Sequence, residues 1–326
     1  MPQRLQQRII KSKITFPLMV ILALLLWIVG IEWSLTEEIS LTGWWGTFNL
    51  PAWVVEGGNL LLCSVAAYLM AELNNSYALV GHRSTLHTSF LLLLWVSLPL
   101  SCHSLTGNLF LVCLLWSILF LFRCYQVVLP GEVAHLFFFI GISSLIQFPI
   151  VVFIPFLYAA LLVFKALSIR TFCASLIGLL LPYWLLFAHA FWHGQKELFF
   201  APWQSFRQSF VWDYSTISTS NWLTMGYTAL LFLYSGSYVL TNGHRYKIRT
   251  RLFLFFLFWW SLFALLLWVL NPSAWSALAA TPIIGVSILS GHVFAHSSTR
   301  VSNILFLVAL VLLIVLSVYG SVWMLW

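Results

Sequence analysis

Residues 241–270 read TNGHRYKIRTRLFLFFLFWWSLFALLLWVL, and the two parts of this stretch have opposite character. Residues 241–251 hold four of the chain's Lys and Arg residues, whereas residues 252–270 contain no charged side chain. An apolar stretch of about 20 residues is long enough to cross the hydrocarbon core of a bilayer as an α-helix. Lys and Arg accumulate in the cytoplasmic loops of membrane proteins. The stretch therefore predicts a transmembrane helix that begins at the cytoplasmic face.

The overall composition also indicates a membrane protein. Hydrophobic residues make up 62% of the 326 residues and charged residues 7%, and the mean hydropathy is +0.98. A soluble domain has about 45–50% apolar and about 25% charged residues. Because no stretch is long and polar enough for a soluble domain, residues 1–326 are expected to form one integral-membrane domain. Nucleic acid is not expected as a partner, since the net charge of +7 is divided among short loops.

Hydropathy divides the chain into about eleven apolar segments of spanning length. The predicted fold class is all-α, a polytopic transmembrane helix bundle, because helices satisfy their own backbone hydrogen bonds in lipid. The expected spans are residues 14–32, 53–71, 85–101, 105–122, 132–147, 150–167, 171–191, 221–240, 252–270, 274–290 and 301–320.

The distribution of Lys and Arg orients these spans. With the N-terminus inside, the inner segments hold every Lys and Arg residue except Lys196 and Arg207. Removing one span would destroy this pattern, so the charges support the span count as well as the orientation. We therefore expect the N-terminus inside and the C-terminus outside.

Ionisable residues are nearly absent from the expected middle of the membrane. Proton- or sodium-coupled transporters usually place carboxylates or broken helices there, so a coupled transporter is disfavoured. The five cysteines have no paired spacing and predict buried side chains, with no metal site or disulfide framework. Gly141, Ser143 and Ser144 are small enough to let a helix approach closely, within the chain or in a second copy.

Polar residues gather instead at the expected outer boundary, mainly in the loops 34–52 and 192–220. In the second loop, Trp203, Phe206, Phe210 and Val211 follow a helical spacing and predict a short helix lying in the membrane interface. Two interpretations remain open. The aromatic residues form a belt that anchors ordinary loops, or the loops enclose an outer-leaflet cavity for an amphipathic lipid or a lipid-linked substrate.

Two resemblances add to this interpretation. One part of the chain resembles polytopic glycosyltransferases of the GT-C class. The residues that carry this resemblance are Gly141-Ile-Ser-Ser-Leu-Ile-Gln-Phe-Pro149, Pro155, the basic turn 165–170 and Gly178 to Tyr183. Over most of its length the chain resembles more closely an uncharacterised family of bacterial multi-pass inner-membrane proteins. That likeness is carried by residues 72–79 with Arg83, 107–110, 141–183 and 248–251. It implies a bacterial inner-membrane location but no particular activity.

The GT-C resemblance implies roles for individual residues. Glu37 and Glu38 occupy the position of the acidic pair after the first span, where a carboxylate serves as general base and activates the acceptor that attacks the anomeric carbon of a polyprenyl-phosphate sugar. Glu56 and His193 would lie beside the substrate or its phosphate, and Lys196 and Arg207 would bind a lipid phosphate. The chain departs from the class in having no aspartate in that loop, a shorter loop, and no large outer domain.

Three functions follow as hypotheses. The first is a non-catalytic cell-envelope component or assembly partner, the second a GT-C-like glycosyltransferase, and the third a lipid or glycolipid flippase. The expected partners are the bilayer and either a lipid-linked sugar or another envelope protein, and the sequence specifies no cofactor.

Overall fold

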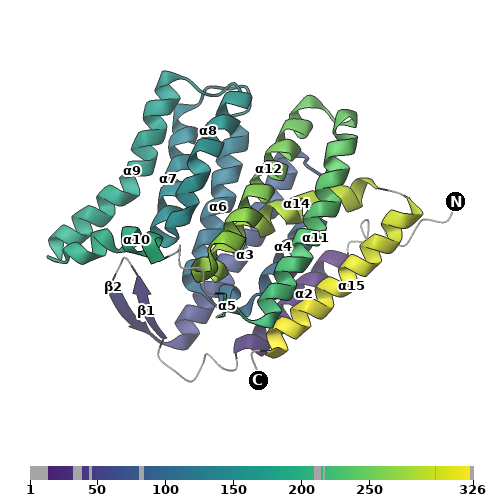
Figure 1. Cartoon of the computed structure of the whole chain (residues 1–326), viewed down its shortest axis with the longest axis horizontal. Coiled ribbons are helices and arrows are strands. Elements are labelled where there is room, and N and C mark those ends of the chain that lie inside the picture. Colours follow the sequence, from purple (N-terminus) through teal and green to yellow (C-terminus); the bar gives the residue numbers. More distant parts are fainter. Residues whose placement is uncertain are drawn as a thin grey trace.

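The computed structural model describes residues 14–31, 39–43, 46–80, 84–208, 214–215, 217–297 and 299–323. It is a helical bundle with one small β-hairpin (Figure 1). The helices in chain order are α2 (Thr15–Ile31), α3 (Ala52–Tyr77), α4 (Leu86–Val96), α5 (Pro99–Cys102), α6 (Leu105–Arg123), α7 (Pro130–Ile146), the 3₁₀ helix η1 (Phe148–Phe153), α8 (Ile154–Val163), α9 (Ile169–Trp192), α10 (Lys196–Gln208), α11 (Thr219–Asn242), η2 (Gly243–Arg245), α12 (Ile248–Leu270), η3 (Pro272–Ala274), α13 (Trp275–Leu278), α14 (Ala280–His296) and α15 (Arg300–Trp323).

The helices occupy the positions expected for the spans. Among the described residues, six helices have the length and hydropathy to cross a membrane, and five shorter apolar segments are also helical. Two boundaries differ because of proline. The expected span 85–101 is interrupted at residues 97–98, where Pro99 starts α5. The expected span 274–290 begins later, since residues 272–278 first form η3 and α13 after Pro272.

The β-hairpin departs from the all-α expectation. Strand β1 (Ile39–Gly43) pairs antiparallel with β2 (Gly46–Leu50), where the sequence predicted an irregular loop. Ile, Thr and Phe in these strands are β-formers, and a glycine ends one strand and begins the other. Each strand is only five residues long, so its β preference is a weak signal beside the hydropathy of the flanking spans.

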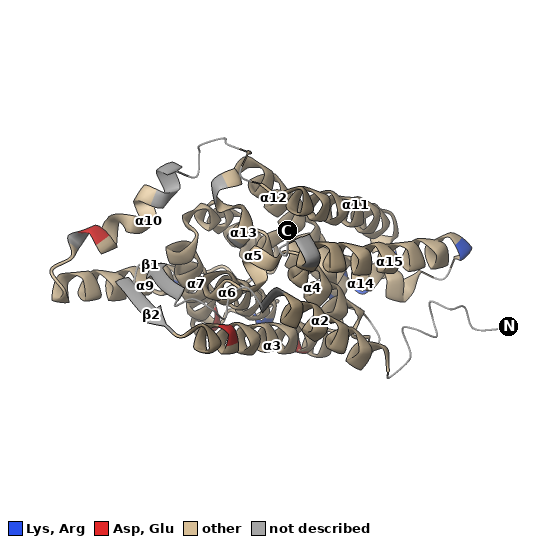
Figure 2. Cartoon of the chain, turned by 90° about the horizontal axis from the view of Figure 1, so that it is seen from below, with Lys and Arg blue, Asp and Glu red and all other residues tan. Residues whose placement is uncertain are grey.

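The two ends of the bundle differ in charge. The hairpin, α5 and α10 lie at one end, which we call the hairpin end, and the α8–α9 and α11–α12 turns lie at the opposite, basic end (Figure 1). Those two turns and the starts of α9 and α12 contain Lys165, Arg170, Arg245, Lys247, Arg249 and Arg251. Figure 2, viewed from below, shows acidic residues on α10 and α3.

Two glycines determine how closely α7 and α9 pack. A Cβ atom added at Gly178 of α9 would lie 2.2 Å from the carbonyl oxygen of Ala134 in α7. A Cβ added at Gly141 of α7 would lie 2.9 Å from both Leu179 and Pro182 of α9. The hydroxyl groups of Ser144 and Tyr183 are hydrogen-bonded at 2.8 Å across the same contact. The small residues of this segment therefore pack a neighbouring helix of the same chain.

This contact predicts that Gly178→Ala destabilises the fold. The added methyl group meets backbone atoms, which cannot move away as a side chain would, and overpacking of this kind costs about 1–3 kcal/mol. Gly226→Ala in α11 is the matched control, because a Cβ there has no neighbour within 4 Å. Thermal unfolding in detergent should show a lower midpoint for Gly178→Ala and an unchanged or slightly higher one for Gly226→Ala. Equal midpoints for both variants would contradict the packing.

Candidate functional site

A glutamate lies buried near the start of α3, at the hairpin end. The helix begins after Pro51, and Glu56 is on its first turns with only 3% of its surface exposed. Its Oε2 atom lies 3.0 Å from Nδ1 of His103. Because a carboxylate oxygen accepts hydrogen bonds, His103 donates from Nδ1.

The turn between α4 and α6 places His103 opposite Glu56. Pro99 begins the short helix α5, and His103 is the residue that ends it. Ser104 then caps α6, with its hydroxyl accepting a hydrogen bond from the backbone N–H of Gly107. Gly107 allows the turn to close tightly, because a Cβ there would lie 3.0 Å from the carbonyl oxygen of Ser101. The break in the expected span 85–101 is therefore what positions the histidine.

Two buried asparagines connect this pair to the core. Asn59 lies one turn beyond Glu56 on the same face of α3, and its amide donates to Glu56 Oε2 at 3.4 Å and to the His103 carbonyl at 2.9 Å. Asn108 of α6 donates to Asn59 at 3.0 Å and to the Cys102 carbonyl at 2.6 Å. Its oxygen accepts from Trp95 Nε1 at 2.7 Å. Both asparagines are completely buried, so we call Glu56, Asn59, His103, Asn108 and Trp95 the polar network.

Two atoms at this site have no hydrogen-bond partner among the described residues. Oε1 of Glu56 is buried and unpaired, and so is Nε1 of Trp27 in α2. The Trp27 ring stacks on the His103 imidazole, with ring centroids 5.5 Å apart and planes at 19°. Buried polar groups in proteins are nearly always hydrogen-bonded, so an unpaired acceptor on Glu56 and an unpaired donor on Trp27, two residues that both contact His103, point to a missing polar group.

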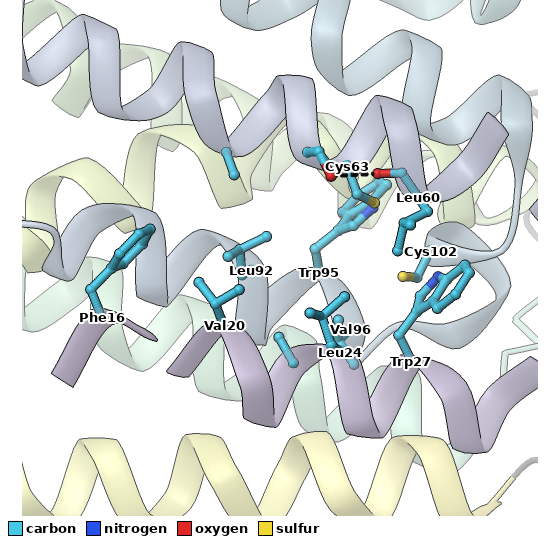
Figure 3. Close-up of a pocket in the computed structure, with 13 residues that line it drawn as sticks. Phe16, Val20, Leu24, Trp27, Leu60, Cys63, Leu92, Trp95, Val96 and Cys102 are labelled. Atoms are coloured by element: carbon cyan, nitrogen blue, oxygen red, sulfur yellow. Dashed lines mark hydrogen bonds between the residues drawn. The ribbon is translucent and has the colours of Figure 1, made fainter. Parts of the chain in front are cut away.

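An apolar groove leads to the polar network. It runs between α2, α3 and α4, has a volume of about 260 Å³, and is lined on α2 by Phe16, Val20, Leu24 and Trp27 (Figure 3). Leu60 and Cys63 of α3 line the opposite wall in the same view. Cys63 also contacts the network, since its thiol lies 3.0 Å from the Asn108 side-chain oxygen. Trp27, Trp95 and Cys102 belong to both the groove and the site around His103.

The structure locates some of the residues suggested by the sequence. Glu37 and Glu38 lie outside the described residues. Lys196 and Arg207 lie in α10, but their side chains fall outside the described part. His193 is exposed at the end of α9, with its ring 4.5 Å from that of His189. Of the candidate residues whose side chains are described, Glu56 lies in the polar network and His193 does not.

Sequence reasoning missed His103, Asn59, Asn108 and Trp27 as members of one site. A usable signal was present, since Asn59 and Asn108 are amides within apolar segments and need buried partners there. Asn59 and Asn108 lie 49 positions apart in sequence, and a hydropathy pattern does not show which distant residues contact one another.

The loop 192–220 contains a helix, as predicted, which is α10 at residues 196–208. Trp203 is about half exposed, and its ring lies 4.7 Å from that of Phe148 in η1. Phe210 and Val211, the other half of the predicted apolar stripe, lie outside the described residues. This helix therefore packs on the hairpin end beside α9 and η1 rather than extending away from the bundle.

A second site with histidines, one buried and one half-buried, lies near the end of α14. His292, expected in a loop, is inside the helix and completely buried. Its Nδ1 lies 2.6 Å from the Leu79 carbonyl oxygen, and its ring lies 4.4 Å from that of His296 and 4.7 Å from that of Tyr246. These contacts tie α14 to the end of α3 and to the loop before α12, which is a structural role.

Within the described ranges, no group of three or more His, Cys, Asp or Glu side chains is arranged to hold a metal ion. Cys102, Cys113 and Cys124 are buried as expected, whereas Cys173 is exposed on α9. Comparison with protein-family models, with curated proteins and with solved structures returns no match to this chain.

The polar network predicts a large effect of Asn108→Leu. The substitution keeps the side-chain volume but leaves Trp95 Nε1 and the Cys102 carbonyl without partners. Each such buried group costs about 1–3 kcal/mol, although hydrogen bonds between membrane helices average only about 0.6 kcal/mol. We expect the free energy of unfolding to fall by about 1–3 kcal/mol in a denaturation titration in micelles.

Ser64→Ala is the control, because the Ser64 hydroxyl is exposed and bonds only to its own helix at Leu60. The double variant Asn108→Leu with Trp95→Phe should lose less than the sum of the two single variants, since the same hydrogen bond is removed twice. Additive losses would show that the two side chains are not coupled.

Proposed function

We propose that this chain is a multi-pass membrane protein that holds the hydrocarbon chain of one lipid in the groove between α2, α3 and α4. The observation that carries the proposal is the continuity of an apolar groove with a buried polar network at one end. Lipid sites have this amphipathic design, with a long apolar wall and a few placed polar groups.

The dimensions of the groove suit a single chain. Along α2 it extends from Phe16 to Trp27, which at about 1.5 Å per residue is ~16 Å. That length is close to half of the ~30 Å hydrocarbon thickness of a bilayer. The volume of about 260 Å³ lies just below the ~300 Å³ lower limit of ordinary small-molecule pockets. Leu24 and Leu60 are exposed at its rim, so a chain in the bilayer can enter sideways.

We further propose that the six long and five shorter apolar helical segments form eleven spans, with the N-terminus inside and the C-terminus outside. The basic character of the α8–α9 and α11–α12 turns supports this orientation, and it assigns the hairpin end to the outer face. The resemblance to bacterial inner-membrane proteins supports a location in that membrane. In the favoured version, the chain is a non-catalytic envelope component that presents its bound lipid, or binds an assembly partner, at the outer face.

Blocking the groove should abolish lipid capture. Ala67 of α3 lines the groove, and Ala67→Trp would fill it. In nanodiscs containing a diazirine-labelled long-chain lipid probe, we expect cross-linking to peptides of α2, α3 and α4 in the wild-type protein. We expect Ala67→Trp to reduce this cross-linking at least fivefold.

Ala159→Trp is the matched control, because Ala159 lines a different apolar furrow, between α8 and α12. Cross-linking in α2 and α3 should survive this substitution. Uniform labelling of all lipid-facing helices in the wild-type protein would contradict the proposal, since it would mean that the groove holds no lipid in preference to the rest of the surface.

A GT-C-like glycosyltransferase is the second candidate, and the Glu56–His103 pair favours it. A carboxylate bound to Nδ1 orients an imidazole so that Nε2 can take a proton from an acceptor hydroxyl. In this version the groove would hold the polyprenyl chain of the donor, and Glu37 or Glu38 would lie near the sugar. A flippase gains no comparable support, because the network is buried at one end of the bundle and forms no polar path through the described residues.

The transferase candidate predicts distinct effects for its two possible bases. If His103 is the base, His103→Asn should reduce envelope glycan formation at least a hundredfold while Glu37→Gln and Glu38→Gln leave it intact. If a loop carboxylate is the base, one of the latter two variants should be inactive. Glycan profiles that depend on the gene but are unchanged in all three variants would exclude this candidate.

A further inference from the structure

We propose that the polar end of the bound lipid is a free hydroxyl group, which donates a hydrogen bond to Glu56 Oε1 and accepts one from Trp27 Nε1. This inference rests on the proposed lipid groove and adds the chemical class of the ligand, a long-chain alcohol without charge at its head.

The acceptor side of the argument begins with Glu56. Its Oε2 atom is already used by His103 and Asn59, at 3.0 and 3.4 Å. Its Oε1 atom is buried and has no partner within the described ranges. A carboxylate oxygen accepts and does not donate, so the missing group at this atom must present an O–H or N–H.

The donor side comes from Trp27. Its indole Nε1 is a donor only, and it is buried without an acceptor among the residues that the structure describes. Its ring is stacked on His103, the partner of Glu56, so the two residues with unpaired atoms contact the same imidazole. Trp27 also lines the groove beside Cys102 (Figure 3). A chain lying against α2 therefore brings its end to the unpaired donor on Trp27, and His103 connects Trp27 to the unpaired acceptor on Glu56.

Only some head groups match both atoms. A phosphate ester is anionic and presents acceptors, so it would be repelled by the carboxylate. A quaternary ammonium has no hydrogen to donate, and a primary ammonium donates to Glu56 but cannot accept from Trp27. A hydroxyl group does both with one oxygen atom. A hydroxyl head group beside Glu56 would therefore differ from the lipid phosphate that the GT-C resemblance implies there.

The test uses four photoreactive probes with the same diazirine-bearing hydrocarbon chain and different ends: a primary alcohol, its methyl ether, its phosphate monoester and the plain hydrocarbon. The full-length protein in nanodiscs is cross-linked with each probe at equal membrane concentration, and labelling of α2 and α3 is quantified. We expect the alcohol to label about tenfold more than the ether, which retains the acceptor but lacks the donated hydrogen. The phosphate should label least among the polar probes.

Two variants test whether Trp27 Nε1 and Glu56 Oε1 cause the preference for the alcohol probe. Trp27→Phe keeps the aromatic stack but removes the donor, and it should lower the ratio of alcohol to hydrocarbon labelling by several fold. Glu56→Gln should lower the ratio of alcohol to ether labelling, because the amide can also donate to an ether oxygen. Trp53→Phe is the control for tryptophan removal, since Trp53 is 71% exposed at the start of α3. The thermal midpoint of each variant is measured, and only variants that melt as the wild-type protein does are compared.

The outcomes separate the two proposals. Equal labelling of the groove by all four probes, abolished by Ala67→Trp, would keep the lipid groove and overturn the hydroxyl inference, with water satisfying the two atoms instead. A phosphate probe that labels best would also overturn it. Absence of preferential groove labelling with every probe would overturn the lipid groove itself.

Discussion

The arrangement at the hairpin end depends on how a carboxyl group is accommodated among apolar helices. Glu56 has almost no contact with solvent, and a buried charge or unpaired polar group is expensive in a protein interior or a bilayer. The His103 imidazole and the Asn59 amide satisfy one of its oxygens. Asn108 extends the network to α4 through Trp95, so α3, α4, α5 and α6 are held together by one set of hydrogen bonds.

On the groove side, the polar network has fewer hydrogen-bond partners for its buried polar atoms. The helix α2 contributes aliphatic and aromatic side chains to the groove, and among them Trp27 brings a single polar atom. A cavity of this kind is favourable in a bilayer only when its walls contact hydrocarbon, since an empty void loses dispersion contacts on every side. In the proposed function, a lipid chain would supply those contacts along α2, and a polar group at its end would pair with Glu56 and Trp27. The groove and the network are in this sense two parts of one site.

Much of the fold could be predicted from the sequence, because hydrophobic length and loop charge act locally. The segment 252–270 and its basic loop were sufficient to place α12, and the same reasoning placed the other apolar helices with bounds that differ by up to six residues. The hairpin at residues 39–50 was not predicted, since its β preference is weak beside the hydropathy of its neighbours. The start of α14 was misplaced because Pro272 and the residues after it form a separate turn.

The candidate site was predictable only in part. Glu56 stood out as an acidic residue at the edge of a span, but the charge pattern gave no indication that it is buried. Its partner His103 lies 47 positions away in a turn created by Pro99, and such a pairing depends on how α3 and α6 pack. His193 was predicted at the same outer boundary of the membrane as Glu56, but it is exposed at the end of α9. A similar predicted depth in the membrane therefore does not show that two polar residues contact each other.

The most direct test of this account is an electron cryomicroscopy map of the protein in a lipid nanodisc. We predict an elongated non-protein density along α2 between Phe16 and Trp27, with its end within hydrogen-bonding distance of Glu56. A map that resolves lipids elsewhere on the bundle but shows the groove closed by the side chains of α2 and α3 would contradict the account.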